Sequence, residues 1–134
     1  MRTKTIRQTV IFPGAPPWEI YDLLMDSKKH AAFTGERASI SPKVWGRISA
    51  YGGYIRGRNL ELIKGKKIVQ EWISSDWPEG HKSTVSFSFS KSKGGTRLTF
   101  VHRGVPAKDF SSKSNGWKEF YWKPMKAKLD ARVG

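Results

Sequence analysis

Residues 117–129, with the sequence WKEFYWKPMKAKL, decide the fold because they read as one long helix with a single apolar face. The apolar face is made by Trp117, Phe120, Tyr121, Met125 and Leu129. Side chains at this spacing share one side of an α-helix and must pack on another apolar surface. Pro124 interrupts the pattern, because an interior proline removes a backbone hydrogen bond and clashes with the preceding turn. We therefore expect a helix over 117–129 that is kinked at Pro124.

The surface that this helix covers is predicted to be a sheet, because much of the preceding sequence alternates with a period of two. In VSFSFS at 85–90, Val85, Phe87 and Phe89 lie on one side and serines on the other, as in a half-buried strand. The strands are expected at 4–12, 38–42, 47–51, 54–63, 68–74, 85–90 and 96–102. The glycine pair at 52–53 suits a two-residue hairpin turn.

Two short helices are expected between the first two strands. Pro17 can open a helix that runs to Met25, since proline is tolerated at the first helical position. Ser27 is a candidate cap for a second helix over 28–33, which stops near Gly35. The complete order predicts an α+β domain in which a curved antiparallel sheet of about seven strands wraps around the long C-terminal helix.

The size and composition limit the classes to which the protein can belong. The 134 residues suit a single domain, 1–134, with its own core. Cysteine is absent, which excludes disulfides and thiolate chemistry. The longest apolar runs are only a few residues, too short for a membrane span or a signal peptide. We therefore expect an intracellular, cytoplasmic protein.

The net charge is +14, and the basic residues are spread along the chain. Such a field attracts nucleic acid, anionic membranes and acidic proteins, but charge alone specifies none of them. An ordinary solvated surface is the favoured interpretation. Tight nucleic-acid binding would need the basic residues gathered on one face, so we do not expect specific binding to nucleic acid.

Several short strings resemble a known family in their order and spacing. They are AFT at 32–34, Gly57, IVQEW at 68–72, WPEGH at 77–81, GTRL at 95–98, RGVP at 103–106 and GWKEFY at 116–121. The chain resembles the helix-grip fold of START domains and birch-pollen allergens, and more specifically the C-terminal domain of the activator of heat-shock protein 90 ATPase. The resemblance implies a helix-grip domain that binds rather than catalyses, with a co-chaperone-like or stress-response role and a chaperone or other acidic protein as partner.

Two features depart from that family. The usual glycine pair before the third strand reads Trp45-Gly46 here, so we expect the bend at this point to differ. The co-chaperone also carries a separate N-terminal domain that does much of the chaperone activation, and these residues contain no counterpart. The resemblance therefore implies the fold more directly than the co-chaperone activity.

A curved sheet around one helix often leaves a cavity, and this suggests a second hypothesis. The domain would then be a carrier or sensor of a small hydrophobic ligand. The candidate lining residues are large aromatic side chains of the expected strands and helix: Trp45, Tyr51, Trp72, Phe87, Trp117, Phe120 and Tyr121. Most aromatic residues are core residues, so a filled core is the alternative to an open pocket.

The string WPEGH at 77–81 supplies a candidate protein-binding loop with Trp77, Glu79 and His81. An exposed tryptophan beside basic residues would be a binding hot spot. A tryptophan folded back on the sheet edge explains the string equally well, and both interpretations stay open here.

The sequence points to no catalytic residue, metal site or cofactor. His30, His81 and His102 lack metal-ligand spacing, and each is more simply structural or solvated. Glu71 could act as a base inside a cavity, but a strand glutamate that faces solvent explains it equally well. The glycine pairs do not precede helices and lack the spacing of a phosphate loop. We therefore expect a protein that is not an enzyme.

Overall fold

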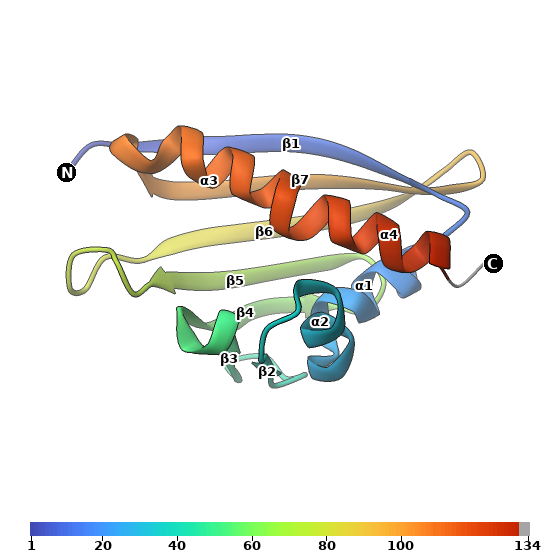
Figure 1. Ribbon diagram of the computed structural model, residues 1–134, viewed down its shortest axis with the longest axis horizontal. Helices are drawn as coiled ribbons and strands as arrows, with labels where there is room; N and C mark the ends of the chain where they lie inside the picture. Colours follow the sequence, from blue (N-terminus) through green and yellow to red (C-terminus); the bar gives the residue numbers. More distant parts are fainter. Residues whose placement is uncertain (132–134) are drawn as a thin grey trace.

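The structure is a computed structural model, which describes residues 1–131. One antiparallel sheet has the strand order β1-β7-β6-β5-β4-β3-β2, so that β2 to β7 form a meander and β1 joins beside β7 (Figure 1). The strands are β1 (Thr3–Pro13), β2 (Ser39–Ile40), β3 (Arg47–Ala50), β4 (Ile55–Ile63), β5 (Lys67–Ser74), β6 (Ser83–Ser92) and β7 (Gly95–Pro106). The expected seven-stranded antiparallel sheet is confirmed.

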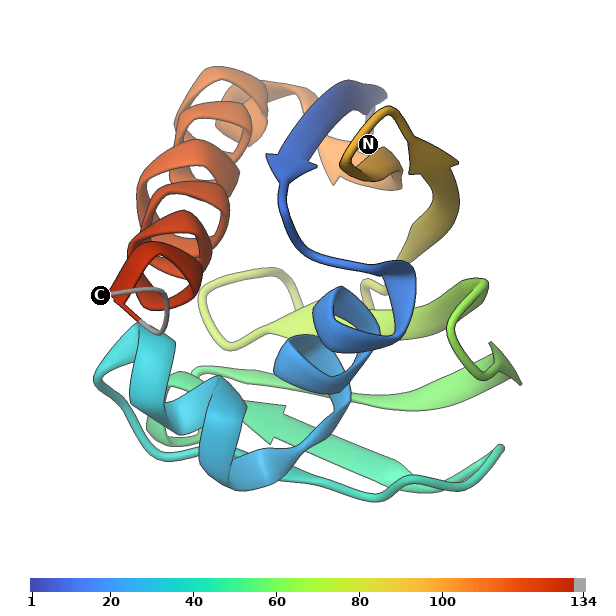
Figure 2. The same ribbon diagram turned by 90° about the vertical axis from the view of Figure 1, so that its right-hand side faces the viewer.

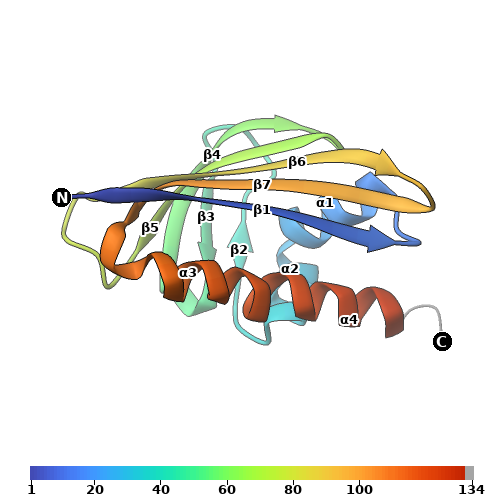
Figure 3. The same ribbon diagram turned by 90° about the horizontal axis from the view of Figure 1, so that it is seen from above.

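The helices lie on one side of this sheet. The short helices are α1 (Pro17–Met25) and α2 (Ser27–Thr34), and the C-terminal helix consists of α3 (Phe110–Trp117), the π-helical turn η3 (Lys118–Trp122) and α4 (Lys123–Ala131). Single 3₁₀ turns occur at η1 (Tyr51–Gly53) and η2 (Ala107–Asp109). Figures 2 and 3 show the C-terminal helix running along the concave side of the curled sheet, with α1 and α2 beside its far end. This arrangement is the helix-grip fold.

The core lies between the sheet and the C-terminal helix. Val85, Phe87 and Phe89 are buried, whereas the alternating serines are half-buried or exposed, as the period of two predicts. The same alternation buries one face of the outer and central strands, where the most deeply buried side chains are Ile6, Phe12, Ile68, Leu98 and Phe100. Burial of this apolar face stabilises the sheet against the helix.

Local details differ from the expectations at three places. Asp26, not Ser27, caps α2, because the Asp26 carboxylate accepts the N–H of Lys29 at 3.0 Å. The β3–β4 connection is the 3₁₀ turn η1, longer than a two-residue turn, and Tyr51 itself has a positive φ of 51°. The C-terminal helix begins at Phe110, one and a half to two turns earlier than the apolar stripe indicates, since polar residues fill that first segment.

Gly57 sets the close approach of β4 and β5. It pairs with Trp72, and a Cβ at this position would collide with the backbone carbonyl of Glu71. Only glycine lacks that atom, so only glycine allows the two backbones to approach this closely. The close pairing of β4 and β5 therefore depends on this residue.

Candidate functional site

The C-terminal helix changes its hydrogen-bonding pattern directly above the middle of the sheet. In the π-helical turn η3, the N–H of Lys123 donates to the carbonyl of Lys118, five residues earlier. Pro124 has no N–H, so the carbonyl of Phe120 lacks its usual helical donor. The hydroxyl of Tyr51 donates to that carbonyl instead, at 3.0 Å. We expected a kink at Pro124; the irregularity is instead a π turn in the residues before the proline, and the helix continues through Pro124 (Figure 3).

The extra residue in the π turn changes which aromatic side chains face the sheet. Trp117, Tyr121, Met125 and Leu129 are buried as expected. Phe120 is 59% exposed, so its placement on the apolar face was wrong. Trp122 is buried in its place, because a π turn rotates the following residues relative to a regular α-helix. Three consecutive aromatic residues at 120–122, two positions before Pro124, were the signal for this change.

Three polar bonds fasten Trp117, at the end of α3, and two aromatic side chains of the π turn to separate elements. The indole N–H of Trp122 donates to Oε1 of Gln8 on β1 at 2.6 Å. The hydroxyl of Tyr121 bonds Nε2 of His30 on α2 at 2.9 Å. Buried polar groups need such partners, so these bonds fix the rotation of the helix on the sheet.

The third bond also fixes the proton of His102. The indole N–H of Trp117 donates to Nδ1 of His102 at 3.1 Å. Because an indole nitrogen can only donate, Nδ1 accepts and the proton of a neutral His102 lies on Nε2. That N–H donates to the hydroxyl of Ser83 at 2.7 Å. Both ring nitrogens are therefore engaged, and neither can act on a bound molecule.

A cavity of about 660 Å³ opens beside the π turn, between the C-terminal helix, η1 and the ends of β4 and β5. Five of the seven expected lining residues meet there: Tyr51, Trp72, Trp117, Phe120 and Tyr121. Trp72 and Trp117 form the wall, with ring centroids 4.9 Å apart. Tyr51 packs edge-on against Phe120 at 6.1 Å. The volume is in the range of small-molecule pockets.

The other two expected residues lie elsewhere. Phe87 is buried in the core against Phe100, with ring centroids 5.3 Å apart, and does not line the cavity. Trp45 is 65% exposed in the connection between β2 and β3, far from the C-terminal helix. An aromatic residue can serve a core, a pocket or a surface, and the residue type does not distinguish these places.

The mouth of the cavity carries both signs of charge, from Glu36, Asp76 and Asp109 and from Lys113. The Lys113 ammonium donates to the Tyr54 hydroxyl at 3.0 Å and lies 5.0 Å from the centre of the Tyr54 ring. These contacts hold its charge at the rim. Sequence reasoning singled out Glu36 as a carboxylate that could lie in a cavity but not Asp76, Asp109 or Lys113, since these come from separate parts of the chain.

Burial keeps the inner wall uncharged near neutral pH. It lowers the pKa of His102 to about 3, and the positive charge of Lys113 adds to this effect. It also lowers the pKa of His30, which lies behind Tyr121 rather than in the wall, against the opposing hydrogen bond to the Leu24 carbonyl. Burial raises the pKa of Tyr51 to about 12, with a further contribution from Glu36. The wall can therefore offer rings and hydroxyls to a ligand, but no charge.

The loop at 75–82 is folded back on the sheet, which decides between the two interpretations of Trp77. Trp77 is only 7% exposed, and its ring packs edge-on against His81 at 5.2 Å. Nε2 of His81 bonds the carbonyl of Gly104 on β7 at 2.7 Å. Glu79 remains exposed at the tip. Trp77 is thus not an exposed binding residue.

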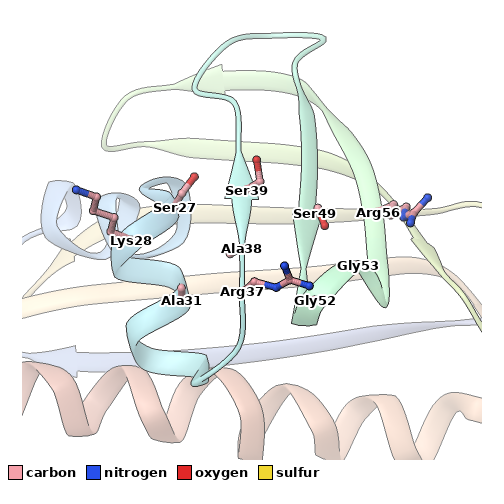
Figure 4. Close-up of a pocket in the computed structure, with 10 residues that line it drawn as sticks. All are labelled: Ser27, Lys28, Ala31, Arg37, Ala38, Ser39, Ser49, Gly52, Gly53 and Arg56. Carbon is pink, nitrogen blue, oxygen red and sulfur yellow. The ribbon is translucent and has the colours of Figure 1, made fainter.

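A second hollow, of about 500 Å³, lies between α2 and the strands β2 and β3 (Figure 4). Ser27 closes one wall, because its hydroxyl accepts the N–H of Ile40 at 2.8 Å. Arg37 lies opposite, beside Gly52, whose N–H donates to the Arg37 carbonyl at 3.0 Å. Its lining combines the cationic Lys28, Arg37 and Arg56 with serine, alanine and glycine, in contrast to the aromatic wall under the C-terminal helix.

The outer face of the sheet, turned away from the helices, gathers arginines. Each alternates with buried residues of its own strand, so the outer arginines are Arg7 on β1, Arg47 on β3, Arg56 and Arg58 on β4, and Arg97 and Arg103 on β7. We call these six residues the arginine face. The basic residues are spread along the sequence, yet strand alternation places these arginines on one surface.

One row of the arginine face crosses five strands. Arg47 pairs with Arg58, Arg58 with Glu71, Glu71 with Thr84 and Thr84 with Arg103. Like charges directly opposite each other destabilise a sheet. The pair of Arg47 and Arg58 is therefore unfavourable, although Glu71 on the other side of Arg58 offsets part of the repulsion.

Comparisons with known proteins agree with this fold. The sequence model of a family described as "Activator of Hsp90 ATPase homolog 1-like protein" matches residues 14–130. The chain belongs to this family.

Individual relatives show the same likeness. An activator of 90 kDa heat shock protein ATPase homolog from Dictyostelium discoideum is 35% identical over 117 residues, which are 87% of this chain and 30% of that protein. The human homolog 1 is 29% identical over 122 residues, 91% of this chain and 35% of that protein. The chain thus spans about a third of the length of these relatives.

Among solved structures, an HSP90 activator from Plasmodium falciparum superposes with a TM-score of 0.83 at 27% identity, covering 97% of each chain.

The described residues contain neither a cluster of metal ligands nor a helix that could cross a membrane. Within 1–131, no three histidine, aspartate or glutamate side chains gather as metal ligands would. In the same range, no helix has both the length and the apolar character to cross a membrane.

Proposed function

We propose that this chain is a non-enzymatic, co-chaperone-like domain that binds a chaperone of the heat-shock protein 90 type in the cytoplasm. The observation that carries the proposal is the arginine face, which belongs to a sheet surface that no helix of the described chain covers (Figure 2). A basic surface of this kind complements an acidic protein and accelerates its association. The names of the relatives support a chaperone as that protein.

The cavity supports binding rather than catalysis. Both nitrogens of His102 have partners, and Tyr121 is held by His30. Burial raises the pKa of the Tyr121 hydroxyl well above its usual value. A general base needs a free acceptor and a pKa near the working pH, and these groups offer neither.

The direct test is calorimetric titration of heat-shock protein 90 with this chain at low and physiological salt. We expect binding that weakens as salt rises, because salt screens surface charges. The double variant Arg47→Glu/Arg58→Glu should bind about tenfold more weakly or worse. Because the change at Arg58 also sets a glutamate opposite Glu71, the melting temperature of the variant is measured beside its affinity, and only affinity lost by a folded variant counts.

The matched control is Lys118→Glu/Lys128→Glu, which makes the same change in charge on exposed positions of the C-terminal helix. The lower net charge slows association of both double variants alike, whereas only the arginine variant loses direct contacts with the partner. The lysine variant should therefore bind within about twofold of the unchanged chain. Absence of binding at low salt would contradict the proposal. Equal losses of affinity in both double variants would show that the arginine face is not the binding surface.

A second function is favoured by the aromatic cavity of about 660 Å³ beside the π turn. A small hydrophobic ligand could lie against Trp72 and Trp117. Native mass spectrometry of gently purified protein should then detect an adduct, and the ligand should raise the melting temperature.

Gly116→Leu is the matched variant for this second function. Gly116 lines the cavity, and an added Cβ would make only an ordinary contact with Phe120, at 3.7 Å. The leucine should fill part of the cavity and abolish the adduct while the domain stays folded. An adduct of equal abundance in this variant would place the ligand elsewhere.

A further inference from the structure

Trp45 stands in a backbone conformation that favours glycine. Its φ is 68°, in the left-handed region, and its side chain is 65% exposed. A bulky residue in this region strains the backbone, and an exposed indole gains little from burial to offset the strain. Glycine would avoid the cost. Such strain at an exposed position points to a function of the side chain.

The connection that carries Trp45 is held rigidly by one buried residue. Asn59 is fully buried, and its side-chain amide donates to the carbonyls of Ser41 at 2.7 Å and Lys43 at 2.9 Å. Its backbone carbonyl accepts the N–H of Trp45 at 2.8 Å, and its N–H donates to the carbonyl of Gly46 at 3.0 Å. These four bonds hold residues 41–46 in a single conformation, which lowers the entropy cost of binding.

The indole lies beside the arginine face. Trp45, Arg47 and Arg58 line the same surface hollow of about 770 Å³, together with Arg56 and Lys82. Val44 adds a second apolar side chain that is 46% exposed. Figure 4 shows the connection between β2 and β3 at the ends of these strands away from the C-terminal helix. Tryptophan and arginine are the residues most often found as binding hot spots.

We propose that Trp45 anchors a docking surface for an acidic protein. The indole enters an apolar recess of that protein, and carboxylates of the protein pair with Arg47 and Arg58. The proposal rests on the proposed function in taking the heat-shock protein 90 type chaperone as that protein. The exposed Val44 beside Trp45 favours a protein over a nucleic acid, because an aliphatic side chain can be buried by a protein surface but has no partner on a phosphate backbone. Glu71, in the same row, is paired with Lys82 at 3.7 Å, which reduces its repulsion of an acidic partner.

The test is Trp45→Gly, which removes the indole and relieves the strain at the same time. We expect a melting temperature that is unchanged or raised by about 3 °C. Affinity for heat-shock protein 90 should fall about tenfold or more. The matched control is Trp18→Ala, which removes an indole that is 56% exposed beside Gly65 in the β4–β5 turn. Its affinity should stay within about twofold.

The outcomes separate this proposal from the proposed function. If the unchanged chain binds the chaperone and Trp45→Gly binds equally well, the docking surface is overturned and the function stands. If the unchanged chain does not bind it, an acidic glutamate–tyrosine copolymer is titrated while the indole N–H resonances are followed. A shift of the Trp45 resonance without one of Trp18 then supports the surface, and no shift overturns it. Larger shifts with duplex DNA or anionic vesicles overturn the choice of a protein.

Discussion

Replacing His102 by glutamine tests whether this buried ring is neutral and held by two hydrogen bonds. His102→Gln keeps an acceptor for the Trp117 indole and a donor for the Ser83 hydroxyl, so the two bonds at 3.1 Å and 2.7 Å can be retained. What the variant removes is the titratable ring. The change should therefore alter the pH dependence of stability more than stability at neutral pH.

The magnitude follows from linkage between proton binding and folding. The pKa of His102 falls from 6.5 to about 3 on folding, so between these values the unfolded chain binds a proton that the folded chain excludes. Stability from this residue is complete above the unfolded pKa and is lost as the pH falls toward the folded pKa. Each pH unit in that window costs about 1.4 kcal/mol. Between about pH 7 and about pH 5, His102 should cost about 2 kcal/mol.

Urea unfolding at these two pH values measures the difference. The free energy of unfolding of the unchanged chain should fall by about 2 kcal/mol more than that of His102→Gln. Carboxylates and His30 are common to both proteins, so their contributions cancel in the comparison. Equal losses in the two proteins would show that His102 takes up its proton in the folded state, and the account of the cavity wall would be wrong.

Three further variants test the framework. Gly57→Ala should destabilise the domain by about 3 kcal/mol or more in thermal unfolding, because the new Cβ would meet the Glu71 carbonyl. Gly116→Ala, at a helical glycine with space around it, should instead be neutral or stabilising by up to about 1 kcal/mol, and a loss at both sites would refute the steric reason. Asn59→Ala should cost about 2–4 kcal/mol, since it leaves the buried Gln70 amide without its partner at 3.0 Å. Hydrogen exchange should also speed up at 41–46, and unchanged exchange there would mean that Asn59 does not hold the connection.

Much of the architecture could be predicted from the sequence because the hydrophobic pattern is local. The alternation around Phe87 specifies a half-buried strand, and the stripe from Trp117 to Leu129 specifies a helix that needs a sheet. The exchange of Phe120 for Trp122 could not be read in this way. It depends on the π turn, which is supported by the hydroxyl of Tyr51, a residue far away in the sequence.

Only part of the candidate site could be predicted, because residue type alone does not say where an aromatic side chain lies. Tyr51, Trp72 and Tyr121 were expected in the cavity and line it, but Trp45 has the same residue type and lies on the outside. The sequence left two positions possible for Trp77, exposed or folded back on the sheet, and its contact with His81 shows the buried one. The arginine face could have been found, because strand alternation alone assigns these arginines to the outer side.

Cross-saturation NMR of the deuterated chain bound to heat-shock protein 90 tests most directly where a partner docks. The account predicts that saturation reaches the amides of 41–46, β3 and β4, beside the arginine face and Trp45. Saturation that is instead confined to the C-terminal helix and to η1 would place the partner over the cavity mouth and contradict the account.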